Sequence, residues 1–209
     1  MKRKSLPIIL LLLTAAIFTG CIRDDRYIVQ PDQPPVYQAG FSEEFDSDVR
    51  GWAFDDQFDS AYAFVQNGQY KFVDYSYTGG FHIASVPTGI PLNRSFVIQT
   101  SMSSNNAMAL IFGASASDFG YSIFVDDQGY FAVYKEGYNP EVIIDWQNSS
   151  AIRTGHNDVE IEQANGYWYG YINGVEVFNT PARHLSGTEC GFMLLANTTG
   201  YADYLRAKW

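Results

Sequence analysis

The chain has 209 residues, of which 46% are hydrophobic, 16% aromatic and 17% charged. This length can bury one sizeable core, and the apolar share excludes a wholly disordered chain. The formal net charge is −10; residues 1–20 hold three of the 13 Lys and Arg residues and no acid, so the remainder carries ten bases, 23 acids and a charge of −13. So acidic a surface repels phosphate backbones, and we expect no nucleic-acid partner.

The N-terminus has the pattern of a secretory signal. Three basic residues at 2–4 precede an almost wholly apolar stretch at 6–18, which is too short to span a membrane. The small residues directly before Cys21 resemble the lipobox of bacterial lipoproteins. This resemblance implies a signal peptide at 1–20 and a lipidated Cys21 that holds the chain on a membrane without spanning it. An ordinary signal peptide with an incidental cysteine is the alternative.

The next segment suggests where such a lipoprotein is displayed. Residues 22–26, Ile-Arg-Asp-Asp-Arg, resemble the export signal of surface lipoproteins in the Bacteroidota. The resemblance implies an outer-membrane lipoprotein that faces the outside of the cell, with a periplasm-facing location as the alternative. Residues 27–40 contain Pro31, Pro34 and Pro35 and few apolar side chains, so we expect residues 21–40 to form a lipidated, Pro-rich tether.

Residues 41–209 are predicted to form one all-β domain. About a dozen short segments of alternating apolar residues recur there, separated by turn residues, and this pattern is typical of a sandwich or barrel. Asn-Gly pairs at 67–68, 165–166 and 173–174 predict tight hairpin turns, because type I′ turns need positive φ at both central residues.

Counting through the last two turns fixes a register for residues 158–178. Glu162 then faces Tyr169, Glu160 faces Tyr171, and Gly170 faces Val177. Because side chains alternate between the two faces of a sheet, one face is predicted to be core. This face holds Val159, Ile161, Trp168, Ile172, Val175 and Val177. The other face is acidic and aromatic and holds Asp158, Glu160, Glu162, Tyr167, Tyr169, Tyr171 and Glu176.

Several segments, taken in order, resemble laminin-G-like modules. They are Phe-Ser-Glu-Glu-Phe at 41–45 with Gly51-Trp52, the central meander at 110–113, 119–124 and 129–134, the Asn-Gly hairpin at 158–177, and Ala-Asp-Tyr-Leu at 202–205. The resemblance covers most of residues 41–209 and implies a concanavalin A-like lectin/glucanase jelly-roll β-sandwich. This superfamily contains lectins, carbohydrate-binding modules, glycosidases and adhesion domains, so the fold alone does not decide the function.

The strand at 158–162 carries three carboxylates at alternate positions. Glycosidases of this superfamily carry Glu, Asp and Glu at alternate positions of one strand, and paired carboxylates are what retaining hydrolysis requires. Here the order is Asp158, Glu160, Glu162, which exchanges the outer nucleophile and the central carboxylate. A solvated polar strand face is therefore expected, and no catalytic residue is predicted. A glycoside hydrolase using these carboxylates stays open as an alternative.

Calcium is the one metal that the residues suggest. In many jelly-roll modules the first and last strands lie side by side and share a structural calcium ion, and Glu44 with Asp203 would suit this. No spaced ligand loop is present, so we predict neither a cofactor nor a metal ligand. Cys190 lies in an apolar run and is expected to be a small buried hydrophobe.

The aromatic residues indicate a carbohydrate-binding surface. Sugar C–H faces pack on Tyr and Trp rings, while neighbouring polar side chains bind the hydroxyl groups. The alternative for each tyrosine is an ordinary half-buried strand position. The predicted binding residues are Tyr75, Tyr77, Tyr138, Trp146, Glu160, Tyr169 and Tyr171. We thus expect a non-catalytic module that binds a neutral glycan, with a hydrolase or a protein-binding adhesion module as the alternatives.

Overall fold

The structure is a computed structural model that describes residue 37 and residues 40–58, 60–77 and 79–209. The chain divides into two compact units, residues 1–34 and 35–209, and all described residues belong to the second unit. The expected signal peptide at 1–20 and most of the tether at 21–40, including Cys21, lie outside the described residues. No described helix is long and apolar enough to cross a membrane.

The described residues form fifteen strands in two antiparallel sheets and no helix, which confirms the all-β prediction. The nine-stranded sheet has the order β13 (Val175–Pro181), β12 (Tyr167–Ile172), β11 (Asn157–Ala164), β6 (Phe96–Ser104), β15 (Thr198–Lys208), β4 (Gln69–Asp74), β3 (Ala61–Gln66) and β2 (Phe54–Asp56), with β1 (Gly40–Glu43) paired to β15. The six-stranded sheet has the order β10 (Glu141–Asn148), β9 (Tyr130–Lys135), β8 (Tyr121–Asp126), β7 (Ala107–Ala114), β14 (Glu189–Leu195) and β5 (Phe81–Pro87).

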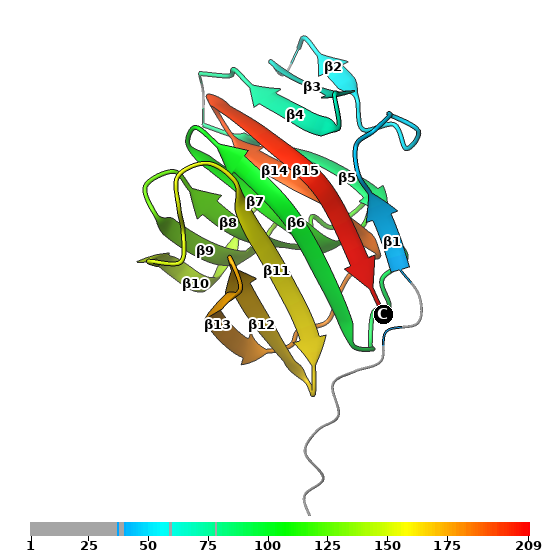
Figure 1. The fold of residues 1–209 in the computed structure, drawn as a ribbon, viewed down its shortest axis with the longest axis vertical. Helices are drawn as coiled ribbons and strands as arrows, with labels where there is room; N and C mark the ends of the chain where they lie inside the picture. The colour runs from blue at the N-terminus through cyan, green and yellow to red at the C-terminus, as the bar shows by residue number, and fades with distance from the viewer. Residues whose placement is uncertain (1–36, 38–39, 59, 78) are drawn as a thin grey trace, which may run out of the picture. The chain divides into compact units, whose positions relative to one another are not determined.

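The two sheets pack face to face, and Figure 1 shows β6, β11 and β15 in front of β7, β8 and β14. Their inner faces share one continuous apolar core. Phe112 of β7 meets Trp168 of β12 edge-on, with ring centroids 5.2 Å apart. Such aromatic pairs between the layers stabilise the sandwich through both buried area and ring geometry. Each sheet therefore keeps one outer face free for other contacts.

The predicted Asn-Gly turns are confirmed by the backbone. Asn67, Asn165 and Asn173 have φ of 56°, 52° and 50°, and the glycine after each also has positive φ. The predicted pairing of β11 with β12 is correct at every counted position, including Glu162 with Tyr169. Turn chemistry and side-chain alternation together were therefore sufficient to fix this hairpin.

The predicted pairing of Gly170 with Val177 is wrong. A bulge in β13 places Phe178 opposite Gly170, although Tyr171 still pairs with Glu176. A Cβ atom on Gly170 would lie 2.0 Å from the ring of Phe178, so the missing side chain makes room for this ring. Phe178 is buried at this bulge. Val175 was predicted to be in the core; it pairs with Ile172 as expected but is 53% exposed on the edge strand β13.

Candidate functional site

The outer face of the six-stranded sheet carries an apolar groove. Strands β7, β8 and β9 are apolar at nearly every position, so apolar side chains emerge on both faces. A second cluster centred on Phe124 and Met193 covers this outer face, separate from the core between the sheets. The groove has a volume of about 190 Å³ and is lined by Phe81, Phe124, Tyr134, Glu136, Pro140, Trp146, Met193 and Leu195.

Aromatic rings gather around Phe124 in this groove. Its ring centroid lies 5.9 Å from that of Trp146 and 6.0 Å from that of Tyr134. The register partners of Phe124 on both sides are alanines, Ala109 and Ala132, whose small side chains leave the space that the neighbouring rings border. Trp146 lies on the edge strand β10 and is 38% exposed, so part of its ring surface is open to a ligand.

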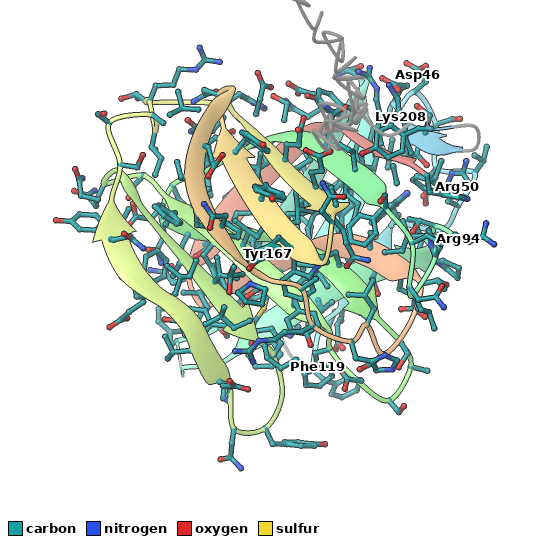
Figure 2. All side chains as sticks on the ribbon, turned by 90° about the horizontal axis from the view of Figure 1, so that it is seen from below. Asp46, Arg50, Arg94, Phe119, Tyr167 and Lys208 are labelled. Carbon is teal, nitrogen blue, oxygen red and sulfur yellow. The ribbon has the colours of Figure 1, made fainter. Side chains whose placement is uncertain are left out.

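A second row of rings extends the groove toward the loop between β9 and β10. Phe81 lies 5.7 Å from Phe119, and Phe119 lies 6.3 Å from Tyr138, measured between ring centroids. Tyr138 is 98% exposed. Figure 2 shows Phe119 well away from the charged residues Arg50 and Lys208. The aromatic surface is therefore broader than the groove itself and lies apart from these charges.

Glu136 supplies the acidic group of the groove. Its backbone N–H donates to the carbonyl of Gly120 at 2.9 Å, which fixes the residue just beyond β9. The Ser122 hydroxyl donates to one carboxyl oxygen, and no other described residue has a hydrogen bond to this carboxyl group. Burial raises the pKa of Glu136, although the Ser122 hydrogen bond and the charge of Lys135 partly offset the rise. One carboxyl oxygen is thus available to a ligand.

The outer face of the nine-stranded sheet carries the predicted acidic and aromatic side chains. Glu160, Tyr169 and Tyr171 lie there on β11 and β12, as expected from the register. A shallow pocket of about 260 Å³ includes Glu160 and Tyr171 and adds two residues from other strands, Gln99 and Tyr204. The predicted acidic and aromatic face is therefore present on the outer side of the nine-stranded sheet. Strands β6 and β15 contribute Gln99 and Tyr204 to its pocket.

The three carboxylates considered for hydrolysis each have a hydrogen-bond donor. Gln99 donates to Glu160 at 2.5 Å, and the Tyr204 hydroxyl donates to Asp158 at 3.4 Å. The hydroxyl of Tyr37, just before β1, donates to Glu162 at 3.1 Å. These neutral donors hold the carboxylates as parts of a polar surface network.

The other predicted residues lie elsewhere, so the seven do not form one cluster. Trp146 and Tyr138 belong to the six-stranded side. Tyr75 and Tyr77 lie in the connection between β4 and β5; Tyr75 packs against Tyr62 at 6.2 Å, and Tyr77 is 98% exposed. The two groups lie on different sheets because β10 (Glu141–Asn148), which carries Trp146, pairs with β9, a relationship that spacing along the chain does not reveal.

Of the eight residues that line the groove, the sequence predicted only Trp146. The seven that it did not predict are Phe81, Phe124, Tyr134, Glu136, Pro140, Met193 and Leu195. A usable signal existed, because the apolar runs at 107–114 and 121–125 do not alternate with polar residues. Such runs occur where both faces of a strand meet apolar surroundings. In a two-layer sandwich, this pattern indicates an apolar outer face.

The carboxylates singled out for calcium have protein partners. The predicted neighbourhood of first and last strands is confirmed, since β1 pairs with β15 (Figure 1). Arg206 binds both oxygens of Glu44, at 2.8 and 2.6 Å, and Gln69 donates to Asp203 at 2.9 Å. Among the described residues, no group of three or more His, Cys, Asp or Glu side chains is arranged to hold a metal ion.

Comparison with known proteins identifies the fold and no sequence family. No protein-family profile matches the chain, and no curated protein matches its sequence. The structure is similar to the CBM2 module of the evolved Dit protein of Lactobacillus casei BL23 phage J-1, with a TM-score of 0.55, 10% identity, and coverage of 83% of this chain and 97% of that one.

Two further structures have similar scores. Carbohydrate-binding module CBM66 from Bacillus subtilis has a TM-score of 0.51 and 15% identity, over 67% of this chain and 86% of that one. A structure described as a native glycosidic hydrolase has a TM-score of 0.50 and 13% identity, over 84% and 98%. The chain therefore has a β-sandwich fold that also occurs in carbohydrate-binding modules and glycoside hydrolases.

Proposed function

We propose that this protein is a non-catalytic module that binds a neutral glycan in the groove on the six-stranded sheet. The observation that carries this proposal is the arrangement of Trp146, Phe124 and Tyr134 around an open groove, with the carboxyl group of Glu136 beside them. Sugar rings present C–H faces that pack on aromatic rings and hydroxyl groups that hydrogen-bond to carboxylates.

Two further observations support this assignment. The fold is shared with carbohydrate-binding modules from a phage and from a Bacillus species, at identities too low to carry over a specificity. The formal charge of −10 also disfavours anionic glycans, because an acidic surface repels them. A neutral glycan is thus the partner that the groove and the charge both support.

The proposal includes the cellular location expected from the N-terminal sequence. Cys21 carries a lipid anchor, and the domain is displayed from an outer membrane, with the periplasmic side as the alternative. Labelling with a radioactive fatty acid tests the anchor: the label should enter the intact chain and be absent from the Cys21→Ser variant. Equal labelling of both chains would overturn the lipid assignment.

Titration calorimetry against a panel of neutral oligosaccharides tests the binding site. The panel contains cellotetraose, xylotetraose, mannotetraose and chitotetraose. Trp146→Ala should lower affinity at least about 10-fold, since aromatic contacts in binding sites contribute about 1–3 kcal/mol. Phe58→Ala is the matched control, because Phe58 is 99% exposed and lies outside both clusters, and it should bind as the parent does.

Two results would overturn the proposal. If no oligosaccharide binds the folded protein, the glycan assignment fails. If Tyr171→Ala abolishes binding while Trp146→Ala does not, the site lies on the nine-stranded sheet. Release of reducing sugar from any panel member that disappears in Glu162→Gln would instead establish the hydrolase alternative.

A further inference from the structure

The polarity of the groove restricts which sugar it can hold. Five of its eight lining side chains carry no oxygen or nitrogen atom, namely Phe81, Phe124, Pro140, Met193 and Leu195. A sugar hydroxyl placed against these walls would lose its hydrogen bonds to water, at a cost of about 1–3 kcal/mol for each unpaired group. An ordinary hexose, which carries a hydroxyl on almost every ring carbon, therefore suits this lining poorly.

The carboxyl group of Glu136 imposes a second requirement. One of its oxygens accepts the Ser122 hydrogen bond, and the other has no hydrogen-bond donor among the residues that the structure describes. Glu136 is only 6% exposed as a residue, but its second carboxyl oxygen is not among the fully buried side-chain atoms that lack a partner, so this oxygen reaches the groove surface. A ligand that covers this oxygen must present an N–H or O–H donor directly beside an apolar group, since an oxygen that is buried without a donor is costly.

The size of the groove sets a third limit. Its volume of about 190 Å³ is below the range of about 300–1,000 Å³ that is typical of sites for drug-sized ligands. One sugar ring with a short substituent fits this space, and an extended oligosaccharide must lie mostly outside it. We therefore expect the groove to recognise one substituted sugar ring of the glycan.

We propose that the groove recognises an N-acetylhexosamine, whose acetamido N–H donates to the free oxygen of Glu136 while its methyl group packs against Phe124 and Trp146. This inference rests on the proposed function and names the class of sugar. An acetamido group joins a hydrogen-bond donor and an apolar methyl group within three bonds, which is the combination that these walls and this carboxyl group require. Its carbonyl oxygen is left to the Tyr134 hydroxyl or to solvent at the groove mouth.

Two pairs of sugars that differ at one position test this inference by titration calorimetry. Chitotetraose and cellotetraose share a β-1,4 backbone and differ only in the acetamido or hydroxyl group at C2, and the methyl glycosides of N-acetylgalactosamine and galactose form the second pair. We expect the acetylated member of at least one pair to bind about 10- to 100-fold more tightly, since a hydrogen bond to a charged group contributes that ratio.

Variants of Glu136 attribute the preference to this residue. Glu136→Met removes the acceptor and should reduce the preference to about threefold or less. Glu136→Gln keeps one acceptor oxygen but removes the charge, so it should lower the preference to about 2- to 12-fold, and it is the second variant if Glu136→Met fails to fold. Ser85→Ala is the control on the same outer face, because the Ser85 hydroxyl donates to Glu189 at 2.8 Å and does not line the groove.

The outcomes separate this inference from the proposed function. If both members of each pair bind equally, and if Trp146→Ala abolishes this binding, the acetamido assignment is overturned while the glycan site is retained. An acetamido preference that persists unchanged in Glu136→Met would overturn the role of Glu136. Absence of binding by every glycan would overturn both proposals.

Discussion

The indole of Trp146 packs on the ring of Phe124 across the intervening strand β9, with ring centroids 5.9 Å apart. This contact fixes the edge strand β10 against the centre of the six-stranded sheet, although its pairing with β9 is interrupted by two register shifts. A ring held in this way presents a ready-made platform, which lowers the entropic cost of ligand binding.

A change in fluorescence quenching should accompany ligand binding at this platform. Trp52 and Trp168 are buried, so quenching by acrylamide reports chiefly on Trp146 and on the partly exposed Trp209. Saturating chitotetraose should reduce quenching in the parent protein and leave the Trp146→Phe variant unchanged. An equal reduction in both proteins would place the ligand away from Trp146.

Asn173 should contribute more stability than its counterpart in the neighbouring hairpin. Both Asn165 and Asn173 have positive φ, but only Asn173 donates to Ala151 and Asn157, at 2.8 and 2.7 Å. Asn173→Ala should therefore lower the free energy of unfolding by about 2–4 kcal/mol, and Asn165→Ala by about 1 kcal/mol. Urea denaturation measures both values, and equal losses would show that the turn conformation alone matters.

Asp74 should make the fold sensitive to acid. This residue is 1% exposed; burial alone raises the pKa of Asp74, but hydrogen bonds from Ser76 and His82 outweigh it and hold the pKa below its usual value. The folded state thus releases this proton more readily than the unfolded state. The stabilisation is present above about pH 4, the ordinary value for Asp, and is lost as the pH falls through the lower folded value.

The Asp74→Asn variant tests this dependence. Its melting temperature should be lower than that of the parent at pH 7, and the difference should narrow as the pH falls from 5 to 3. A difference that stays constant over this range would show that the ionised carboxylate of Asp74 contributes nothing specific.

Glu136 should have the opposite pH dependence. Because burial raises its pKa, the folded state holds this proton more tightly than the unfolded state. The associated stability is complete below about pH 4.3, the ordinary value for Glu, and is lost as the pH rises through the raised folded value. The melting temperature of Glu136→Gln minus that of the parent should therefore rise between pH 4 and pH 8. A difference that stays constant over this range would contradict the prediction.

Cys190 should be inert to thiol reagents in the folded protein. It is fully buried beside Thr88, and this burial raises the pKa of the thiol to about 12. In a chain carrying Cys21→Ser, Ellman's reagent should react with Cys190 only after denaturation. Rapid reaction of the native protein would show that β14 opens locally.

Local chemistry made much of the fold predictable from the sequence. The Asn-Gly turns fixed the β11–β12 register because their backbone conformation permits few alternatives, and alternation then assigned the two faces. The bulge in β13 was not predictable in this way, since it depends on Phe178 entering the space above Gly170. The contact between Phe178 and Gly170 depends on how the two residues pack, and the alternation of apolar and polar residues along each strand carries no information about this packing.

The candidate site was less predictable because it depends on which strands become neighbours. Trp146 was identified from its residue type, but its partner Phe124 lies two strands away and came from an apolar run that resembled ordinary core. Glu136 was missed because a single acid in a loop-flanking position carries no pattern. Its significance follows only from burial and from its hydrogen bond to Ser122.

Calorimetric titration of the parent, Trp146→Ala and Phe58→Ala proteins with chitotetraose and cellotetraose tests whether the six-stranded face binds a neutral glycan. We expect saturable binding to the parent and to Phe58→Ala, and an affinity at least about 10-fold lower in Trp146→Ala. Unchanged affinity in a folded Trp146→Ala protein, or no heat of binding with either sugar or any other panel member, would contradict this prediction.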